Sequence, residues 1–134
     1  MGKKREKLPP RPTDAELGIL RVIWQLGSGT VREILKAMNR DRKTEMGYTT
    51  VLKMLQIMTE KGLVDRDEKV RPQIYRARYS QEHTQRRLLG DLLQRAFGGS
   101  VKTLVLQALS TKKSSPEELE AIEKLLDRME GGGK

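Results

Sequence analysis

Apolar side chains recur at intervals of three and four residues along most of the chain, which predicts helices. In the first of these, Leu17, Leu20 and Trp24 share one face with Ile23 beside them, and residues 27–29 (Gly-Ser-Gly) end the helix. Three Ser/Thr-x-x-Glu capping boxes mark helix starts, because the hydroxyl and the carboxylate each satisfy an amide at the helix end. They lie at Thr13–Glu16, Thr30–Glu33 and Ser115–Glu118.

Two further helices follow the first within a short stretch of chain. The second is short, begins at Thr30 and ends near Asn39, and is followed by a charged connector over residues 40–45. The third is predicted over residues 47–61, closed by Gly62. Its inward face carries Val51, Leu55 and Met58, whereas Thr49, Thr50, Lys53 and Gln56 lie on its other faces.

The pattern then changes to alternation with a period of two, which predicts strands. Residues 63–67 and 74–79 alternate between apolar and polar side chains. Residues 68–73 between them form a basic loop with a proline at position 72. The two segments are therefore expected to pair as a hairpin.

After Ser80 the pattern is purely helical. Leucines and other apolar residues predict three more helices, the last with side chains at heptad spacing, which is typical of helices that pack against a partner. We expect a dimerisation surface formed by Leu88, Leu92, Leu104, Leu119, Ile122, Leu126 and Met129. The expected organisation is a disordered basic arm (1–12), a first domain (13–80), a helical dimerisation domain (81–130) and a disordered tail (131–134).

Charge divides along the same line. The net charge of the chain is +9, and residues 1–80 hold 18 basic against 10 acidic side chains, a net of +8. Residues 81–134 hold 9 against 8, a net of +1. A basic first part joined to a nearly neutral second part favours a polyanionic partner for the first, although charge alone would also serve solubility.

The composition argues against an enzyme and against a bound metal or cofactor. The chain has no cysteine and one histidine, His83, which we interpret as a surface residue. No phosphate loop, nucleophile elbow or zinc-protease motif is present. Met38, Met54 and Met58 stand at helical spacing and are expected to fill the core. No apolar run reaches the roughly 20 residues of a membrane span, and the lack of cysteine fits a reducing cytoplasm.

The order of three helices and a hairpin predicts a winged helix-turn-helix, so the fold is expected to be mostly α-helical with a small β-hairpin. In such a domain the third helix enters the major groove, and helix starts and basic loops meet phosphates. Thr49, Thr50 and Lys53 are the best candidates for base or phosphate contact. Tyr48 is a candidate for phosphate contact or for packing at the helix start. The other predicted DNA-binding residues are Thr30, Arg40, Arg42, Lys43, Lys69 and Arg71.

The motifs themselves resemble the penicillinase-repressor family. The resemblance rests on Thr13 to Leu17, Ile23-Trp24, Gly29 to Ile34, Gly47 to Leu55, Lys61 to Val64 and Tyr75. It is specific over residues 12–80 and weaker through Gly99-Ser100 and Leu104 to Leu106. It implies a homodimeric bacterial repressor with an N-terminal winged helix domain and a C-terminal helical dimerisation domain.

The resemblance also implies a route of release. In the antibiotic-resistance members a membrane sensor leads to proteolysis of the repressor at an Asn-Phe bond in the C-terminal domain. Gln107-Ala108 stands at the nearest aligned position, which puts that bond in doubt. The copper-responsive relatives carry a C-terminal cysteine cluster, which this chain lacks. An unidentified protease or sensor is therefore a predicted partner without a predicted site.

We expect a sequence-specific repressor that binds a pseudo-palindromic operator in double-stranded DNA as a homodimer in the bacterial cytoplasm. The alternative is a winged helix that binds protein as an adaptor. The basic third helix and basic hairpin favour DNA, because an adaptor would not need them.

Overall fold

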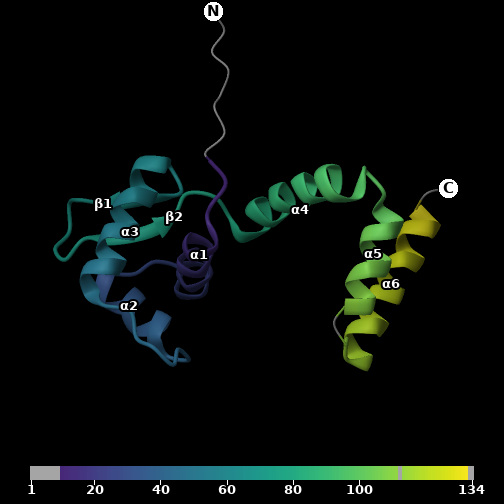
Figure 1. Cartoon of the computed structure of the whole chain (residues 1–134), viewed down its shortest axis with the longest axis horizontal. Helices are drawn as coiled ribbons and strands as arrows, with labels where there is room; N and C mark the ends of the chain where they lie inside the picture. The colour runs from purple at the N-terminus through teal and green to yellow at the C-terminus, as the bar shows by residue number, and fades with distance from the viewer. Residues whose placement is uncertain (1–9, 112, 133–134) are drawn as a thin grey trace, which may run out of the picture. The chain divides into compact units, whose positions relative to one another are not determined.

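The computed structural model describes residues 10–111 and 113–132, which form six helices and one two-stranded antiparallel sheet (Figure 1). In chain order these are α1 (Asp14–Leu26), α2 (Val31–Asn39), α3 (Tyr48–Lys61), β1 (Val64–Asp67), β2 (Ile74–Ala77), α4 (Gln81–Phe97), α5 (Val101–Thr111) and α6 (Pro116–Gly132). The predicted mainly helical fold with a hairpin is confirmed.

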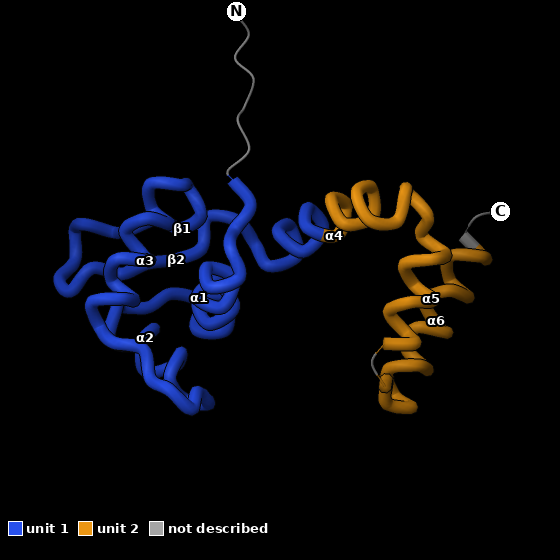
Figure 2. Tube along the Cα trace, in the orientation of Figure 1, with its two compact units in different colours: residues 1–88 blue, residues 89–134 orange. Residues whose placement is uncertain are grey.

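The chain divides into two compact units between Leu88 and Leu89 (Figure 2). The division falls inside α4, eight residues later than the boundary expected after Ser80. The boundary was predicted after Ser80 because the periodicity of the apolar residues changes there from that of strands to that of helices. The first turns of α4 belong instead to the first unit, because Tyr79, His83 and Leu88 line one pocket with Leu63.

Both predicted capping boxes of the first unit form. Thr13 accepts the Glu16 amide at 3.1 Å and Thr30 accepts the Glu33 amide at 3.2 Å, and each glutamate carboxylate accepts the amide of its threonine at 2.9 Å. The four bonds satisfy amides that a helix leaves unpaired at its start. They fix where α1 and α2 begin, and so the direction in which each enters the core.

The core of the first unit is formed by α1, α2, α3 and the hairpin. Val51, Leu55 and Met58 of α3 are fully buried, as their spacing predicted. In α1 the buried apolar residues are Ile19, Leu20 and Ile23, whereas Leu17 and Trp24 pack at the edge of the core. The predicted face of Leu17, Leu20 and Trp24 with Ile23 beside them thus contains two of the three buried apolar residues, but it omits Ile19.

Trp24 instead ties α1 to the end of the hairpin. Its indole Nε1 donates to the carbonyl oxygen of Tyr79 at 3.1 Å, so the ring is half-buried with its polar atom satisfied. Met38 and Met54 likewise pack against the core from its edge, in agreement with their predicted role as fillers.

A buried ion pair joins the start of α1 to the end of α3. Lys61 Nζ lies 2.8 Å and 3.0 Å from the two carboxylate oxygens of Glu16, whose side chain is 6% exposed. Burial raises the pKa of Glu16, but the bonds from Lys61 and from the Thr13 amide outweigh it and hold the pKa below its ordinary value of 4.5. Glu16 is therefore charged at neutral pH and links two helices as well as capping one.

The hairpin forms as predicted, with slightly shorter strands. β1 and β2 pair antiparallel from Val64 with Ala77 to Asp67 with Ile74. Gly29 adds an unpredicted bridge: its amide donates to the Tyr75 carbonyl at 3.0 Å, and its carbonyl accepts the Tyr75 amide at 2.8 Å. The segment between α1 and α2 is thereby bonded to β2, which keeps the hairpin, the wing of this fold, against the helices.

The second unit has a different character, because none of its described residues is buried in the single chain. Leu92, Leu119, Leu126 and Met129 are about half exposed. In residues 10–111 and 113–132, no helix has the length and hydropathy of a membrane span.

The ends of the chain differ from expectation where the structure describes them. Arg11 and Pro12, which the sequence assigned to a disordered arm, line a pocket with Leu63 and Tyr79. At the other end α6 continues through Gly132, so the tail was predicted to begin too early. The tail was predicted from the three glycines at residues 131–133, of which Gly131 and Gly132 belong to α6. Residues 1–9 and 133–134 lie outside the described residues.

Candidate nucleic-acid interface

Helix α3 carries two opposite surfaces. Val51, Leu55 and Met58 are fully buried, which fixes the rotation of the helix about its axis. Thr49, Thr50, Lys53 and Gln56 are exposed, as the sequence predicted. Rigid burial on one side therefore presents hydroxyl, amide and ammonium groups on the other, which are groups that can bond to base edges and phosphates.

The start of α2 contributes a residue that the sequence reasoning missed. The Arg32 guanidinium lies 5.1 Å from the centroid of the Tyr48 ring, a cation–π geometry that joins the first turn of α2 to the first turn of α3. Arg32 is exposed, so its charge adds to this surface. Its only signal in the sequence is a basic residue in the first turn of a capped helix.

Thr30 and Tyr48, both predicted contacts, line one open pocket with Arg32. Pro72 and Gln73 of the hairpin loop line the same pocket. The structure thus brings the starts of α2 and α3 together with the base of the wing. Thr30 is half-buried and its hydroxyl oxygen already accepts the Glu33 amide, so its established role is to cap α2.

The connector between α2 and α3 is held at both ends by one side chain. Asn39 donates to the Met46 carbonyl at 3.0 Å and accepts the Met46 amide at 2.8 Å. Between these ends Arg42 Nε donates to the Thr44 carbonyl at 3.1 Å. The predicted phosphate partners Arg40, Arg42 and Lys43 are all exposed on this loop. The two hydrogen bonds between Asn39 and Met46 were not predicted, because these residues are seven positions apart and fit no helical motif.

The hairpin loop presents Lys69 and Arg71 differently. Lys69 is exposed, and its backbone amide donates to the Asp67 carboxylate at 3.0 Å. Arg71 Nη1 donates to the carbonyl oxygens of Glu68 at 2.7 Å and Val70 at 3.2 Å, so its guanidinium closes the loop. Contact of Arg71 with DNA stays a prediction that must accommodate these two bonds.

Two other hairpin arginines are neutralised within the hairpin. The carboxylate of Glu68, 2.7 Å from Arg66, raises the pKa of Arg66, with a smaller contribution from Tyr75. Asp65, 2.6 Å from Arg78, raises the pKa of Arg78 in the same way. In the part of the chain that the structure describes, Lys43, Lys53 and Lys69 have no such carboxylate partner. The positive charge of the first unit is thus unpaired where DNA contact is predicted.

Among the described residues, no three His, Cys, Asp or Glu side chains lie close enough together to hold a metal ion. The penicillinase repressor family model matches residues 12–128 of the chain. The chain belongs to the penicillinase repressor family. It is a winged-helix transcription regulator that binds DNA, and not an enzyme.

Individual relatives are distant. The chain is 24% identical over 118 residues to the penicillinase repressor of Bacillus licheniformis, which covers 88% of this chain and 91% of the relative. Among solved structures it is similar to a MarR family transcriptional regulator from Silicibacter pomeroyi DSS. That similarity has a TM-score of 0.44 and 13% identity, over 89% of this chain and 69% of the other.

Proposed function

We propose that the protein represses transcription as a homodimer that binds a pseudo-palindromic operator. The observation that carries this proposal is the two-sided helix α3, with Val51, Leu55 and Met58 buried and Thr49, Thr50 and Lys53 exposed. A helix with one face locked in the core places its other face reproducibly, as direct readout of base edges requires.

The phosphate contacts in this proposal come from the parts that flank α3. Arg32 lies in the first turn of α2, whereas Arg40, Arg42 and Lys43 lie at the end of α2 and on the connector to α3. Lys69 lies on the loop between β1 and β2. Contacts of this kind set the register of a protein on duplex DNA without reading sequence. Each neutralised phosphate contributes a slope of about −0.9 to the dependence of log K on log salt concentration, so binding is expected to weaken steeply with salt.

The second unit supplies the dimer. Leu92, Leu119, Leu126 and Met129 expose apolar surface in the single chain, and a second copy would cover it. Two reading units joined in this way meet two half-sites of opposite orientation, which is why the operator is expected to be pseudo-palindromic. Because its proposed partner is double-stranded operator DNA, we expect the repressor to act in the bacterial cytoplasm.

A protein-binding winged helix is the alternative function. The unpaired charge of Lys43, Lys53 and Lys69 argues against it, since a neutral partner would leave these charges without a counterpart. Release of the operator by an unidentified protease or sensor is a further proposal, based on the family resemblance. Gln107 and Ala108 lie within α5, where the backbone is helical, so a protease would have to unwind this helix before cutting there.

The function is tested with Lys53→Ala and a matched control, Lys124→Ala. Both variants remove one exposed ammonium, but Lys124 lies in α6 and approaches only Glu120, at 3.8 Å. Fluorescence anisotropy on a duplex selected from a random library should show about tenfold weaker binding for Lys53→Ala, in line with about 1–3 kcal/mol per specific contact. Lys124→Ala should bind within twofold of the unmodified protein. Equal affinities for the two variants would contradict the role of α3.

A further inference from the structure

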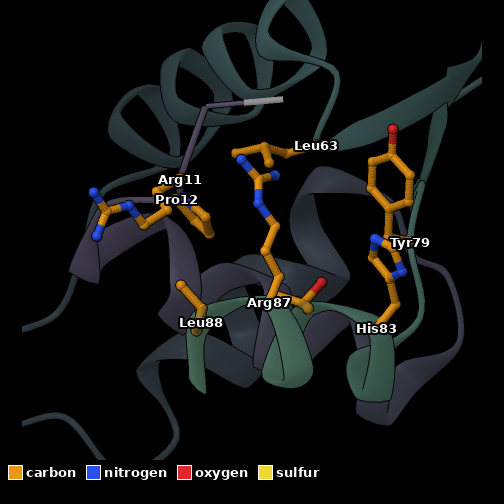
Figure 3. Close-up of a pocket in the computed structure, with 8 residues that line it drawn as sticks. Arg11, Pro12, Leu63, Tyr79, His83, Arg87 and Leu88 are labelled. Atoms are coloured by element: carbon orange, nitrogen blue, oxygen red, sulfur yellow. The ribbon is translucent and has the colours of Figure 1, made fainter. Parts of the chain in front are cut away.

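A pocket in the first unit lies away from the predicted DNA-binding residues. It is enclosed by the end of the hairpin segment, the first turns of α4 and the chain just before α1 (Figure 3). Its lining residues are Arg11, Pro12, Leu63, Tyr79, His83, Thr84, Arg87 and Leu88. None of the residues predicted to contact DNA is among them.

The side chains that line this pocket include basic groups but no acidic ones. Arg87 and His83, one helical turn apart on α4, both line it together with Thr84, whereas the Tyr79 hydroxyl is directed away from Arg87 (Figure 3). No aspartate or glutamate is among the lining residues. The nearby carboxylates of Glu82 and Asp65 are engaged elsewhere, with Arg86 at 2.9 Å and with Arg78 at 2.6 Å.

Arg87 is the central group. It is half-buried, and in Figure 3 its side chain extends between Pro12 and the Tyr79–His83 pair toward Leu63. Within residues 10–111 and 113–132, no carboxylate is paired with it. A guanidinium withdrawn from water next to apolar side chains is stabilised by an anion, to which it can donate two parallel hydrogen bonds.

The opposite wall is rigid. The rings of Tyr79 and His83 stack with centroids 4.9 Å apart and planes inclined by 18°. The Tyr79 carbonyl is held by the Trp24 indole at 3.1 Å, and Ser80 Oγ accepts the His83 amide at 3.0 Å. The backbone of both residues is thus anchored and their rings stack on each other, which lowers the entropic cost of binding.

We propose that this pocket is a binding site for a small oxyanion, with Arg87 as its main ligand and His83, Thr84 and Tyr79 around it. Leu63, Pro12 and Leu88 line the pocket with apolar surface beside these polar groups. The site uses none of the residues predicted to contact DNA, and it shares Leu88 with the predicted dimerisation surface.

Trp24 is a built-in reporter, because it is the only tryptophan and bonds directly to Tyr79. Its fluorescence is followed while inorganic phosphate replaces chloride at constant ionic strength, with calorimetry on the same samples. The unmodified protein should give a saturable change. Arg87→Gln should weaken phosphate binding at least tenfold, whereas Arg86→Gln, a neighbouring arginine paired with Glu82 outside the pocket, should stay within twofold.

Two controls separate this site from the DNA-binding surface. Lys53→Ala should respond to phosphate like the unmodified protein, and Arg87→Gln should bind duplex DNA like it in chloride buffer. The proposal is overturned if the unmodified protein shows no saturable phosphate binding, or if Arg86→Gln loses it as fully as Arg87→Gln. It is also overturned if Arg87→Gln weakens duplex binding tenfold without phosphate, since the pocket would then belong to the DNA interface.

Discussion

The two units use apolar residues at the same helical spacing and reach opposite degrees of burial. In the first, Ile23, Val51 and Leu55 are fully buried, whereas in the second, Leu92 and Leu126 are about half exposed. All the buried apolar side chains of the described residues lie between Ile19 and Tyr75. Periodicity therefore identifies the apolar face of a helix but not what covers it.

The difference has a physical origin in size and topology. The first unit folds three helices and a hairpin around one core and adds bonds between distant segments, such as Gly29 to Tyr75 and Glu16 to Lys61. The second has only helical segments, too few residues to enclose a core of its own. We infer that the first unit is complete in one chain and that the second is completed by another.

A charge placed on the apolar stripe of α6 (Leu119, Ile122, Leu126 and Met129) tests whether a second copy covers it. Leu126→Glu should raise the dissociation constant of the dimer at least about 100-fold, because each buried leucine contributes about 2 kcal/mol and a dimer loses two. Sedimentation equilibrium measures this change. The first unit should keep its fold, seen as an unchanged Trp24 emission spectrum.

Lys124→Glu is the matched control for this variant, since Lys124 lies on α6 about half a helical turn away from the stripe. It should leave the dissociation constant within about threefold. A monomeric unmodified protein at micromolar concentration would contradict the account of the second unit.

The next effect is confined to the first unit. Glu16→Gln keeps the capping geometry, which glutamine also satisfies, but loses the charge that faces Lys61. We expect about 2 kcal/mol of lost stability by urea denaturation, as for a hydrogen bond to a charged group. Glu33→Gln, in the second capping box and without a lysine partner, should change stability by much less.

The same pair predicts a dependence on pH. The pKa of Glu16 is lower in the folded chain than its ordinary value of 4.5, so its contribution is complete above that value and is lost as pH falls through the folded pKa. The stability difference between the unmodified protein and Glu16→Gln should therefore shrink below about pH 4.5. A constant difference down to pH 2 would show that the charge of Glu16 is not its source.

How far the sequence could predict these features depended on how local they are. Capping boxes, helix spacing and the hairpin are set by residues within a few positions, and all were found. The Glu16–Lys61 pair, the Asn39–Met46 hydrogen bonds and the stacking of Arg32 on Tyr48 join separate segments, so no local pattern signals them. The omission of Ile19 from the predicted face of α1 shows the same limit, because the burial of Ile19 is decided by what packs against it.

The smallest expected effect concerns two glycines, one in each unit. Gly62 ends α3 with a φ of +83°, and an added Cβ would lie 3.1 Å from Arg78 Nη1. Gly62→Ala should cost about 1 kcal/mol, because a side chain is disfavoured in this left-handed conformation. Gly90→Ala in α4, where an added Cβ would meet no side chain or other segment within 4 Å, should be neutral or stabilising. Thermal denaturation of both variants measures whether each substitution lowers or raises the stability.

In the proposed function, two copies of the first unit, joined through the second, bind one operator. Duplexes selected from a random library by the full-length protein give the bound sequence, and sedimentation velocity of the complex gives the number of protomers on it. The account predicts an inverted repeat occupied by two protomers, with half-site centres about one helical turn of DNA, or a multiple of it, apart. Selection of a single half-site bound by one protomer, or of no sequence at all, would contradict it.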